Sequence, residues 1–143
     1  MEIIYKRGEA LQLGISNCYD LSVLKRLYDE AETKPTIVQN RFYRDSDYDT
    51  ALREWCKTHA IIYQSFWSLT ANTYLLGSKE VITLAMKYKK SEAQILFAYL
   101  MSQGITPLSG TTSHTHMLED LEAMTLSLTA DEIQSISSLL ALA

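Results

Sequence analysis

The chain has few of the features that define several large protein classes. Its 143 residues include only two cysteines, Cys18 and Cys56, and these form no metal-ligand pattern. A disulfide between them is conceivable, but two cysteines in a chain of this size more often remain free thiols in a reducing compartment. The expected location is therefore the cytosol.

Long apolar stretches and clusters of basic residues are absent as well. The apolar runs are far too short to cross a bilayer, and the opening residues 1–7 lack the charged-then-apolar order of a secretory signal. The formal net charge is -4, with acids and bases interspersed along the chain. A nucleic-acid binder usually has a basic face, and a membrane-surface protein has a cluster of Lys and Arg. We expect neither kind of partner.

What is present is the composition of an ordinary soluble domain. Hydrophobic residues make up 47% of the chain and charged residues 21%, both typical of globular proteins. The length is enough for one domain with its own core. Because no low-complexity segment or linker interrupts the chain, residues 1–143 are expected to form a single domain.

The apolar residues alternate between the period of a strand and the period of a helix. Strands are predicted at Ala10–Ile15, Thr36–Gln39, Ile61–Ser65 and Ile105–Leu108. Helices are predicted after the N-cap Asp20, over Tyr48–His59, Ser78–Tyr88 and Ser91–Ser102, around Thr115–Met124, and from Thr129 to the C-terminus. The segments 91–94 and 129–132 both fit a capping box, and Gly104 is placed to end the helix before it.

Alternating strands and helices with short connections predict βαβ units, and therefore a parallel sheet with its helices outside. Four such strands form either an open doubly wound sheet or half of an eight-stranded barrel, and the pattern alone does not separate these two. A full (β/α)8 barrel takes about 250 residues, so this chain is clearly shorter than one.

Two polar clusters look like ion sites but have simpler explanations. His114 and His116 have no cysteine or third histidine nearby in the sequence, so we expect no metal there. Asp45, Asp47 and Asp49 lack the glycine and the distal glutamate of a calcium loop, which favours a solvated loop and helix start. The remaining histidine, at position 59, ends a helix, where it can interact with the last carbonyl groups.

Five segments, in order, resemble the aldo-keto reductase family. Residues 13–17 (Leu-Gly-Ile-Ser-Asn) are similar to the family's fifth-strand signature, and residues 38–40 (Val-Gln-Asn) to its sixth strand. Residues 61–69 resemble strand seven and its loop, 104–121 resemble strand eight and the next helix, and 126–129 resemble the phrase before the terminal helix. The resemblance extends from Met1 to Leu140. It implies an α/β fold that is the C-terminal half of a (β/α)8 TIM barrel, with strands five to eight as roughly four parallel strands and outer helices.

The resemblance also implies a nicotinamide dinucleotide site, with NADP as the expected cofactor. Ser16, Asn17 and Gln39 correspond to the side chains that hold the nicotinamide carboxamide, a planar group that needs both donors and acceptors. Phe66 stands where the family usually has a tyrosine stacked on the nicotinamide ring, and it keeps the aromatic face.

The positions implied for the other end of the cofactor depart further from the family. The family commonly clasps the 2′-phosphate of NADP with a lysine and an arginine, and here those positions are Gly110 and His116. A mostly neutral histidine does not replace a bidentate arginine, so NAD stays open as the cofactor. By the same resemblance, Ser68 and Leu69 lie in the loop along the pyrophosphate. Thr111 and Thr112 offer hydroxyl or backbone hydrogen bonds to phosphate, and Glu119 and Asp120 face adenine.

Local structural explanations compete with some of these roles. Ser16 and Asn17 are residue types favoured in a strand-end turn that caps the next helix. Gln39, at a strand end, is equally consistent with a structural role. Trp67 is interpreted as a loop-packing aromatic rather than a cofactor contact.

No residue of the chain matches the family's catalytic tetrad of Asp, Tyr, Lys and His, which comes from strands two to four. Tyr43 and Tyr63 have no lysine at a supporting spacing. A reductase that lacks its proton donor keeps binding energy but loses the chemistry. We therefore expect no catalytic residue and no metal ligand in this chain, and no reductase activity from the chain alone.

A half barrel exposes unpaired strand edges and an inward face of apolar residues, which favours association. The candidates for these inward strand residues are Leu11, Leu13, Ile37, Ile62 and Leu108. The partner is a second copy, or a chain that supplies the N-terminal half-barrel, unless the chain is a truncated fragment. The main hypothesis is thus a cofactor-binding half of an NAD(P)H-dependent reductase, and the alternative is a non-enzymatic interaction module.

Overall fold

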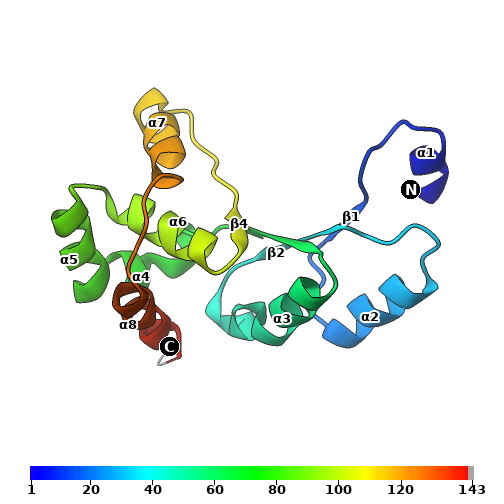
Figure 1. Ribbon diagram of the computed structural model, residues 1–143, viewed down its shortest axis with the longest axis horizontal. Coiled ribbons are helices and arrows are strands. Elements are labelled where there is room, and N and C mark those ends of the chain that lie inside the picture. The colour runs from blue at the N-terminus through cyan, green and yellow to red at the C-terminus, as the bar shows by residue number, and fades with distance from the viewer. Residues whose placement is uncertain (142–143) are drawn as a thin grey trace. The chain divides into compact units, whose positions relative to one another are not determined.

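The computed structural model describes residues 1–141 and contains fourteen helical and strand segments there, which divide into two compact units (Figure 1). Unit 1 is Met1–Phe66, and unit 2 begins at Trp67. The elements of unit 1 are α1 (Glu2–Lys6), β1 (Gly14–Ser16), α2 (Leu21–Glu30), β2 (Ile37–Arg41), the 3-10 segment η1 (Arg44–Asp49), α3 (Thr50–Thr58) and β3 (Ile62–Phe66). Those of unit 2 are η2 (Thr70–Asn72), α4 (Thr73–Leu76), α5 (Lys79–Tyr88), α6 (Glu92–Ser102), β4 (Ile105–Pro107), α7 (His114–Ala123) and α8 (Ala130–Ala141).

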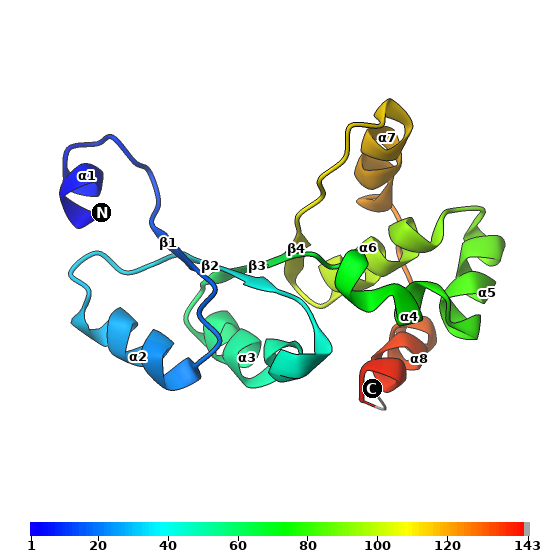
Figure 2. The same cartoon turned by 180° about the vertical axis from the view of Figure 1, so that it is seen from behind.

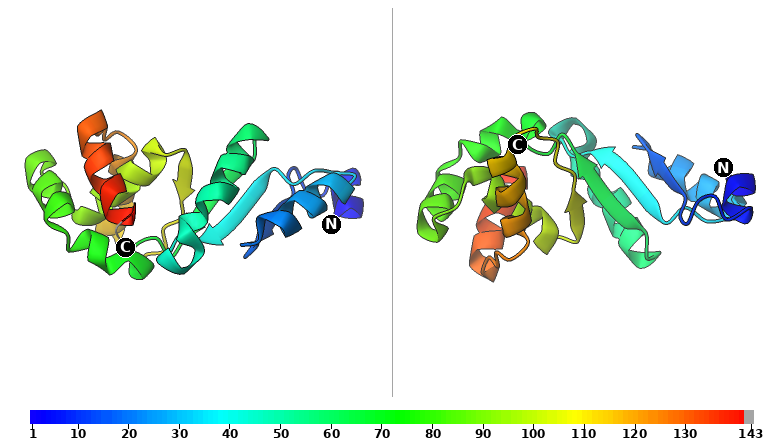
Figure 3. Two further views of the ribbon diagram at one scale, coloured as in Figure 1. Left: turned by 90° about the horizontal axis from the view of Figure 1, so that it is seen from below. Right: turned by 90° about the horizontal axis from the view of Figure 1, so that it is seen from above.

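Unit 1 is a small parallel sheet covered by helices on one face. β1 pairs with β2, and β2 with β3, all in parallel. Figures 1 and 2 show α2 and α3 on the same face of these strands, and the views from below and above in Figure 3 agree. The strand–helix–strand order and the parallel pairing confirm the predicted α/β class.

The period of two in β2 and β3 decides which side chains form the core of unit 1. Val38 and Tyr63 lie on the helix-covered face and are 0% and 3% exposed. Leu24 of α2 and Leu52 and Cys56 of α3 are buried as well. The core therefore lies between the sheet and its two helices.

The predicted inward-facing apolar residues are only partly correct. Ile37 and Ile62 do occupy the face opposite the helices, and Ile62 is 44% exposed. The prediction for Leu11 is wrong, because β1 begins later, at Gly14. Leu11 lies in the segment before it and is 90% exposed. Leu13 also precedes β1, and Leu108 lies beyond the end of β4. Alternation over 10–15 resembled a strand, but the strand pairing begins at Gly14. Just before it, the Leu13 carbonyl accepts from the Thr36 amide at 2.8 Å.

β1 and β2 approach each other closely at Gly14. A Cβ atom there would lie 3.0 Å from the Ile37 carbonyl oxygen and 3.1 Å from Ile37 Cβ. Contacts that short are strained, so the absence of a side chain at residue 14 permits the pairing.

Unit 2 is organised around α6, which contacts α4, α5, α7, α8 and β4. Its residues from Gln94 to Leu100 are all buried, which explains why its sequence is apolar on every side. The predicted capping box is confirmed, since Ser91 Oγ accepts from the Gln94 amide and Gln94 Oε1 accepts from the Ser91 amide. Gly104 follows the helix at φ 74°, as predicted.

The last helix begins at the second predicted capping box. Glu132 Oε2 accepts from the Thr129 amide at 2.7 Å, and Thr129 Oγ1 accepts from the Glu132 amide. The predicted extension of this helix to the C-terminus lies, at 142–143, outside the described residues. Over 1–141, no helix is long and apolar enough to cross a membrane.

Candidate functional site

The carboxyl ends of the three strands of unit 1 bring polar side chains into one row. Ser16 is in register with Gln39, and Gln39 with Gln64. All three lie on the face that the helices leave open. Gln39 Nε2 donates to Gln64 Oε1 at 3.0 Å, which leaves Gln39 Oε1 and the amide protons of Gln64 for a ligand.

Asn17, directly after β1, adds a third carboxamide to this row. Its backbone is left-handed, at φ 56°, and its amide donates to the Gln39 carbonyl at 3.1 Å. Its side chain is oriented by two contacts: Nδ2 donates to Ser16 Oγ, and Oδ1 accepts from the Tyr19 hydroxyl. The helix cap of α2 is Asp20 instead, which accepts from the Ser22 and Val23 amides. Ser16 and Asn17 are thus not used to cap α2.

Behind this turn lies a buried hydrogen-bonded cluster. Asn40 is fully buried, and its side chain accepts from the Cys18 amide at 2.9 Å and donates to the Cys18 carbonyl at 2.7 Å. Asn40 Nδ2 also donates to Asp49, which accepts from the Tyr63 hydroxyl at 2.8 Å. The amide of residue 40 therefore fixes the chain immediately after Asn17.

The cluster corrects one expectation for the acidic run 45–49. Asp49 is 4% exposed rather than solvated. The chain turns through left-handed backbone at Asp47, Tyr48 and Asp49, which carries the last carboxylate inward. Burial, reinforced by the charge of Asp49, raises the pKa of Tyr63. Tyr63 is consequently a neutral hydrogen-bond donor inside the fold, not an acid that faces a ligand.

In unit 2, one cavity of about 860 Å³ collects most of the residues predicted to bind the cofactor. The seven predicted residues that line it are Ser68, Leu69, Gly110, Thr111, His116, Glu119 and Asp120. They come from the loop before η2, the loop after β4 and α7. Thr112 lies in the same loop but does not line the cavity. Residues 68 and 116 are far apart in sequence, so the fold brings them together.

Short-range hydrogen bonds shape the α7 side of this cavity. Ser113 caps α7 by accepting from the His116 amide at 3.3 Å, and the Ser113 amide donates to Thr111 Oγ1 at 3.1 Å. Ser109 Oγ donates to Asp120 Oδ2. The nearly buried Gln94 donates from Nε2 to the Glu119 carbonyl at 2.9 Å. Hydrogen bonds therefore hold both ends of the segment 109–120, which comprises the loop before α7 and the first part of that helix.

The opposite side of the cavity is formed by the loop that begins at Trp67. The Ala71 amide donates to the Trp67 carbonyl at 2.9 Å, and Asn72 Nδ2 donates to the Ser68 carbonyl at 2.9 Å. Trp67 is 57% exposed and lines the cavity. It is therefore not a core residue, and its interpretation as a loop-packing aromatic stays a prediction. A left-handed backbone, with φ 58°, turns its side chain outward.

Sequence reasoning missed Gln64 in the strand-end row and four polar residues that line the cavity: Thr70, Ser91, Glu92 and Ser109. Gln64 belongs to the strand-end row. It lies two residues from both Ile62 and Phe66 along β3, so its side chain is on the same face of the sheet as theirs. Glu92 lines the unit 2 cavity because it starts α6 beside the Trp67 loop. Nothing in the sequence places that helix start there.

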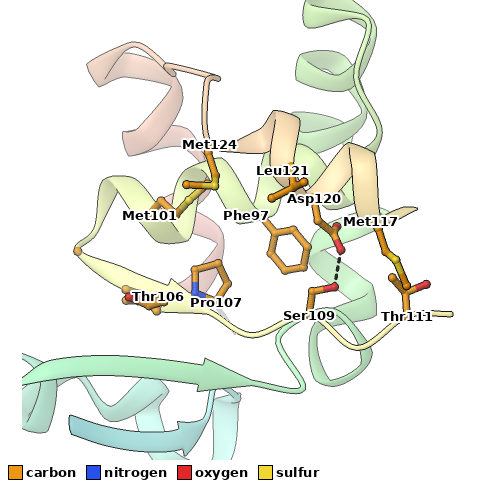
Figure 4. Close-up of a pocket in the computed structure, with 12 residues that line it drawn as sticks. Phe97, Met101, Thr106, Pro107, Ser109, Thr111, Met117, Asp120, Leu121 and Met124 are labelled. Atoms are coloured by element: carbon orange, nitrogen blue, oxygen red, sulfur yellow. Dashed lines mark hydrogen bonds between the residues drawn. The ribbon is translucent and has the colours of Figure 1, made fainter. Parts of the chain in front are cut away.

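A second cavity of unit 2, of about 820 Å³, is walled by apolar side chains of α6, β4 and α7 (Figure 4). Figure 4 shows Met101, Met117 and Met124 around it, with the Ser109–Asp120 hydrogen bond at its edge. This pair also lines the first cavity, so the two cavities are neighbours. Within residues 1–141, no group of three or more His, Cys, Asp or Glu side chains is arranged to hold a metal ion.

Comparisons with known proteins agree with this arrangement. The family model described as "Aldo/keto reductase family" matches residues 1–141. An uncharacterized oxidoreductase of Schizosaccharomyces pombe is 30% identical over 118 residues, covering 82% of this chain and 42% of its own length. The NADPH-dependent alpha-keto amide reductase of Saccharomyces cerevisiae is 29% identical over 147 residues, covering 97% of this chain and 47% of its own length.

Solved structures share the fold at low identity. An aldo-keto reductase enzyme from a Medee basin deep-sea metagenome library superimposes with a TM-score of 0.85 at 20% identity, over 96% of this chain and 50% of that one. The Gox0644 protein, crystallised as a mutant in complex with NADPH, gives 0.85 at 23% identity, over 96% and 49%. The chain thus spans about half the length of its relatives, which confirms that its fold is half of theirs.

Proposed function

The chain belongs to the aldo/keto reductase family, and from this premise we propose that it is the dinucleotide-binding half of an NAD(P)H-dependent reductase that converts a carbonyl into an alcohol. One observation carries the proposal. Seven residues chosen for their match to the family's cofactor positions line a single cavity of unit 2. A cavity of about 860 Å³ is large enough for a substantial part of a dinucleotide.

The residues of this cavity suit a phosphate-bearing ligand. Thr111 and Ser68 offer hydroxyl groups, and Gly110 leaves its backbone open, since a Cβ there meets nothing within 4 Å. NADP is the cofactor that the family resemblance implies, and its reduced form, NADPH, would supply the hydride when bound. The protein's own contribution in unit 2 is to hold the adenosine and pyrophosphate groups.

In unit 1, the polar row of Ser16, Asn17, Gln39 and Gln64 suits a planar carboxamide, because it offers hydroxyl, amide N–H and carbonyl groups on one face. Phe66, the last residue of β3, adds an aromatic ring on the same side as Gln64. These residues would bind and orient the nicotinamide, and none of them supplies a proton for catalysis.

Catalysis is proposed to need a second component. The chain has no match to the family's Asp, Tyr, Lys and His tetrad. By itself it therefore binds the cofactor but does not reduce a carbonyl. The missing groups would come from an N-terminal half-barrel, in the same protein or in a partner. A second copy of this chain would close the barrel but would not add a tetrad.

The test is size-exclusion chromatography with light scattering, with and without excess NADPH or NADH, followed by a calorimetric titration of the same sample. We expect a discrete monomer or dimer that binds a dinucleotide, and no carbonyl reduction until an N-terminal half-barrel is added. Reduction by the chain alone contradicts the missing tetrad. Soluble aggregate that binds no dinucleotide contradicts the proposed cofactor site.

One observation favours the alternative, a non-enzymatic module that associates through its strands. β1 is an edge strand, and exposed apolar residues precede it, including Ile3 at 67% and Leu11 at 90% exposure. Such an edge is a template for pairing with another chain. This alternative predicts a stable dimer or complex with no affinity for dinucleotides, so the calorimetric titration separates the two functions.

A further inference from the structure

The unit 2 cavity has an unusual charge for a site that is to hold phosphate groups. Glu92, Glu119 and Asp120 line it, and His116 is the only basic side chain among its lining residues in the described part of the chain. The nearby Lys90 does not line the cavity, and its Nζ lies 2.7 Å from Glu122 Oε2. The electrostatic potential inside the cavity is therefore negative.

NAD and NADP differ at one group of the adenosine ribose, which is a hydroxyl in NAD and a phosphate in NADP. A phosphate monoester carries about −1.5 to −2 charges at pH 7, so nearby carboxylates repel it. A hydroxyl is neutral and donates a hydrogen bond, which a carboxylate accepts. The same acidic residues thus disfavour one cofactor and recognise the other.

The Asp120 carboxylate and the backbone of Glu119 are held in place before any ligand binds. Ser109 donates to Asp120 Oδ2, a contact that Figure 4 shows, and this leaves Asp120 Oδ1 available as an acceptor. The backbone of Glu119 is anchored by Gln94 Nε2 at 2.9 Å. The Asp120 side chain, fixed in this way, accepts a hydrogen bond with little further loss of conformational entropy.

We propose that this cavity selects a dinucleotide with a free 2′-hydroxyl, so that the chain binds NAD(H) in preference to NADP(H). Glu119 or Asp120, which the family resemblance places beside adenine, accepts instead the hydrogen bond of that hydroxyl. The inference rests on the proposed function, because it specifies which dinucleotide the same cavity takes. It departs from the cofactor that the family resemblance implies.

The experiment is a fluorescence titration of the full chain with NADH and with NADPH, which differ only by the 2′-phosphate. We expect NADH to bind at least about tenfold more tightly, the size of effect that one unfavourable charge contact produces. Equal affinities, or tighter binding of NADPH, overturn the selectivity and leave the proposed cofactor site standing. Binding of neither overturns the cofactor site and the selectivity together.

Charge variants test the cause. Asp120→Asn should raise the affinity for NADPH about threefold, because one repelling charge is removed. The difference between the affinities for NADH and NADPH should become smaller. The matched control is Asp131→Asn, an equal charge change on the exposed first turn of α8, and it should leave both affinities unchanged. If the two variants behave alike, the carboxylate of Asp120 does not set the selectivity.

A gain-of-function variant gives the sharpest result. Gly110 has open space beyond its Cα, so a lysine fits there, and His116 is exposed at the start of α7. The double variant Gly110→Lys, His116→Arg should bring NADPH to an affinity equal to that of NADH or tighter, since it adds two cations beside the 2′ position. An unchanged preference in this variant places the selectivity elsewhere and contradicts the proposal.

Discussion

Asn40 Nδ2 donates a hydrogen bond of 2.7 Å to Asp49 Oδ2 behind the sheet of unit 1, and both residues are buried. The same asparagine binds both backbone groups of Cys18, and Tyr63 donates a second hydrogen bond to the carboxylate. The buried carboxylate is thus tolerated because two donors satisfy it. The pair links the core of unit 1 to the turn that presents Asn17.

This pairing predicts what happens to stability when the amide of residue 40 and the carboxylate of residue 49 are exchanged. Asn40→Asp should destabilise the chain by about 3 kcal/mol, because it places a second buried carboxylate beside Asp49. Adding Asp49→Asn should recover roughly half of that loss, since one carboxylate and one amide face each other again. Urea unfolding followed by circular dichroism measures both. Additive losses in the double variant would show that the two side chains do not interact.

The close approach of β1 and β2 predicts a position-specific effect of adding one methyl group. Gly14→Ala should cost about 1–3 kcal/mol, because the new Cβ meets Ile37 at 3.0–3.1 Å. The matched control is Gly110→Ala, where a Cβ meets nothing within 4 Å, and it should change the free energy of unfolding by less than about 1 kcal/mol. Equal effects of the two substitutions contradict the close approach.

Glu132 predicts a pH-dependent contribution to the stability of unit 2. Burial alone would raise its pKa, but hydrogen bonds from Lys87, the Thr129 amide and Tyr88 outweigh burial and lower the pKa to about 2. A lowered carboxyl pKa stabilises the fold above the unfolded value of about 4.3, and this contribution is lost as pH falls through about 2.

Glu132→Gln should therefore lower the free energy of unfolding at pH 7 by roughly 1–2 kcal/mol, with the difference vanishing near pH 2. Thermal unfolding of both proteins across this range measures it. The comparison variant is Glu54→Gln, on the exposed side of α3, which should show no such pH dependence. A difference that persists unchanged down to pH 2 contradicts the assigned hydrogen bonds.

The two buried cysteines should be alkylated slowly in the native protein. Burial, aided by the charge of Asp49 and by Cys18, raises the pKa of Cys56 to about 11, and burial also raises the pKa of Cys18. Since the thiolate is the reactive form, alkylation by iodoacetamide at pH 8 should be at least about a hundredfold slower than in urea. Mass spectrometry reads the modified fraction of each cysteine. Comparable rates in the two conditions would show that the Cys56 environment is open.

Much of the fold was predictable because local chemistry determines it. The capping residues Asp20, Ser91 and Thr129 act within three or four positions of sequence, and the structure confirms all three. Strand limits were less predictable. The first strand begins only where Gly14 meets Ile37, and a pairing partner 23 residues away leaves no mark on the alternation of Leu11 and Leu13.

The candidate site was predictable only where the family resemblance supplied it. Seven resemblance-based positions converge on one cavity, whereas Glu92 and Trp67 join them through tertiary packing and local backbone turns that no spacing reveals. The inward turn of Asp49 was missed for a related reason. Three successive left-handed residues bury a carboxylate in a segment whose composition is that of a solvated loop.

The most direct test of the central claim is hydrogen exchange of the full chain, measured by mass spectrometry with and without saturating NADH. The account predicts that amides of the segment 109–120, and of the segment 67–72 that lines the same cavity, exchange at least about tenfold more slowly with ligand bound. Helix α8, which does not line the cavity, should show a smaller change. Unchanged exchange in 109–120 at saturating NADH, or slowing confined to other segments, would contradict the assignment of this cavity as the dinucleotide site.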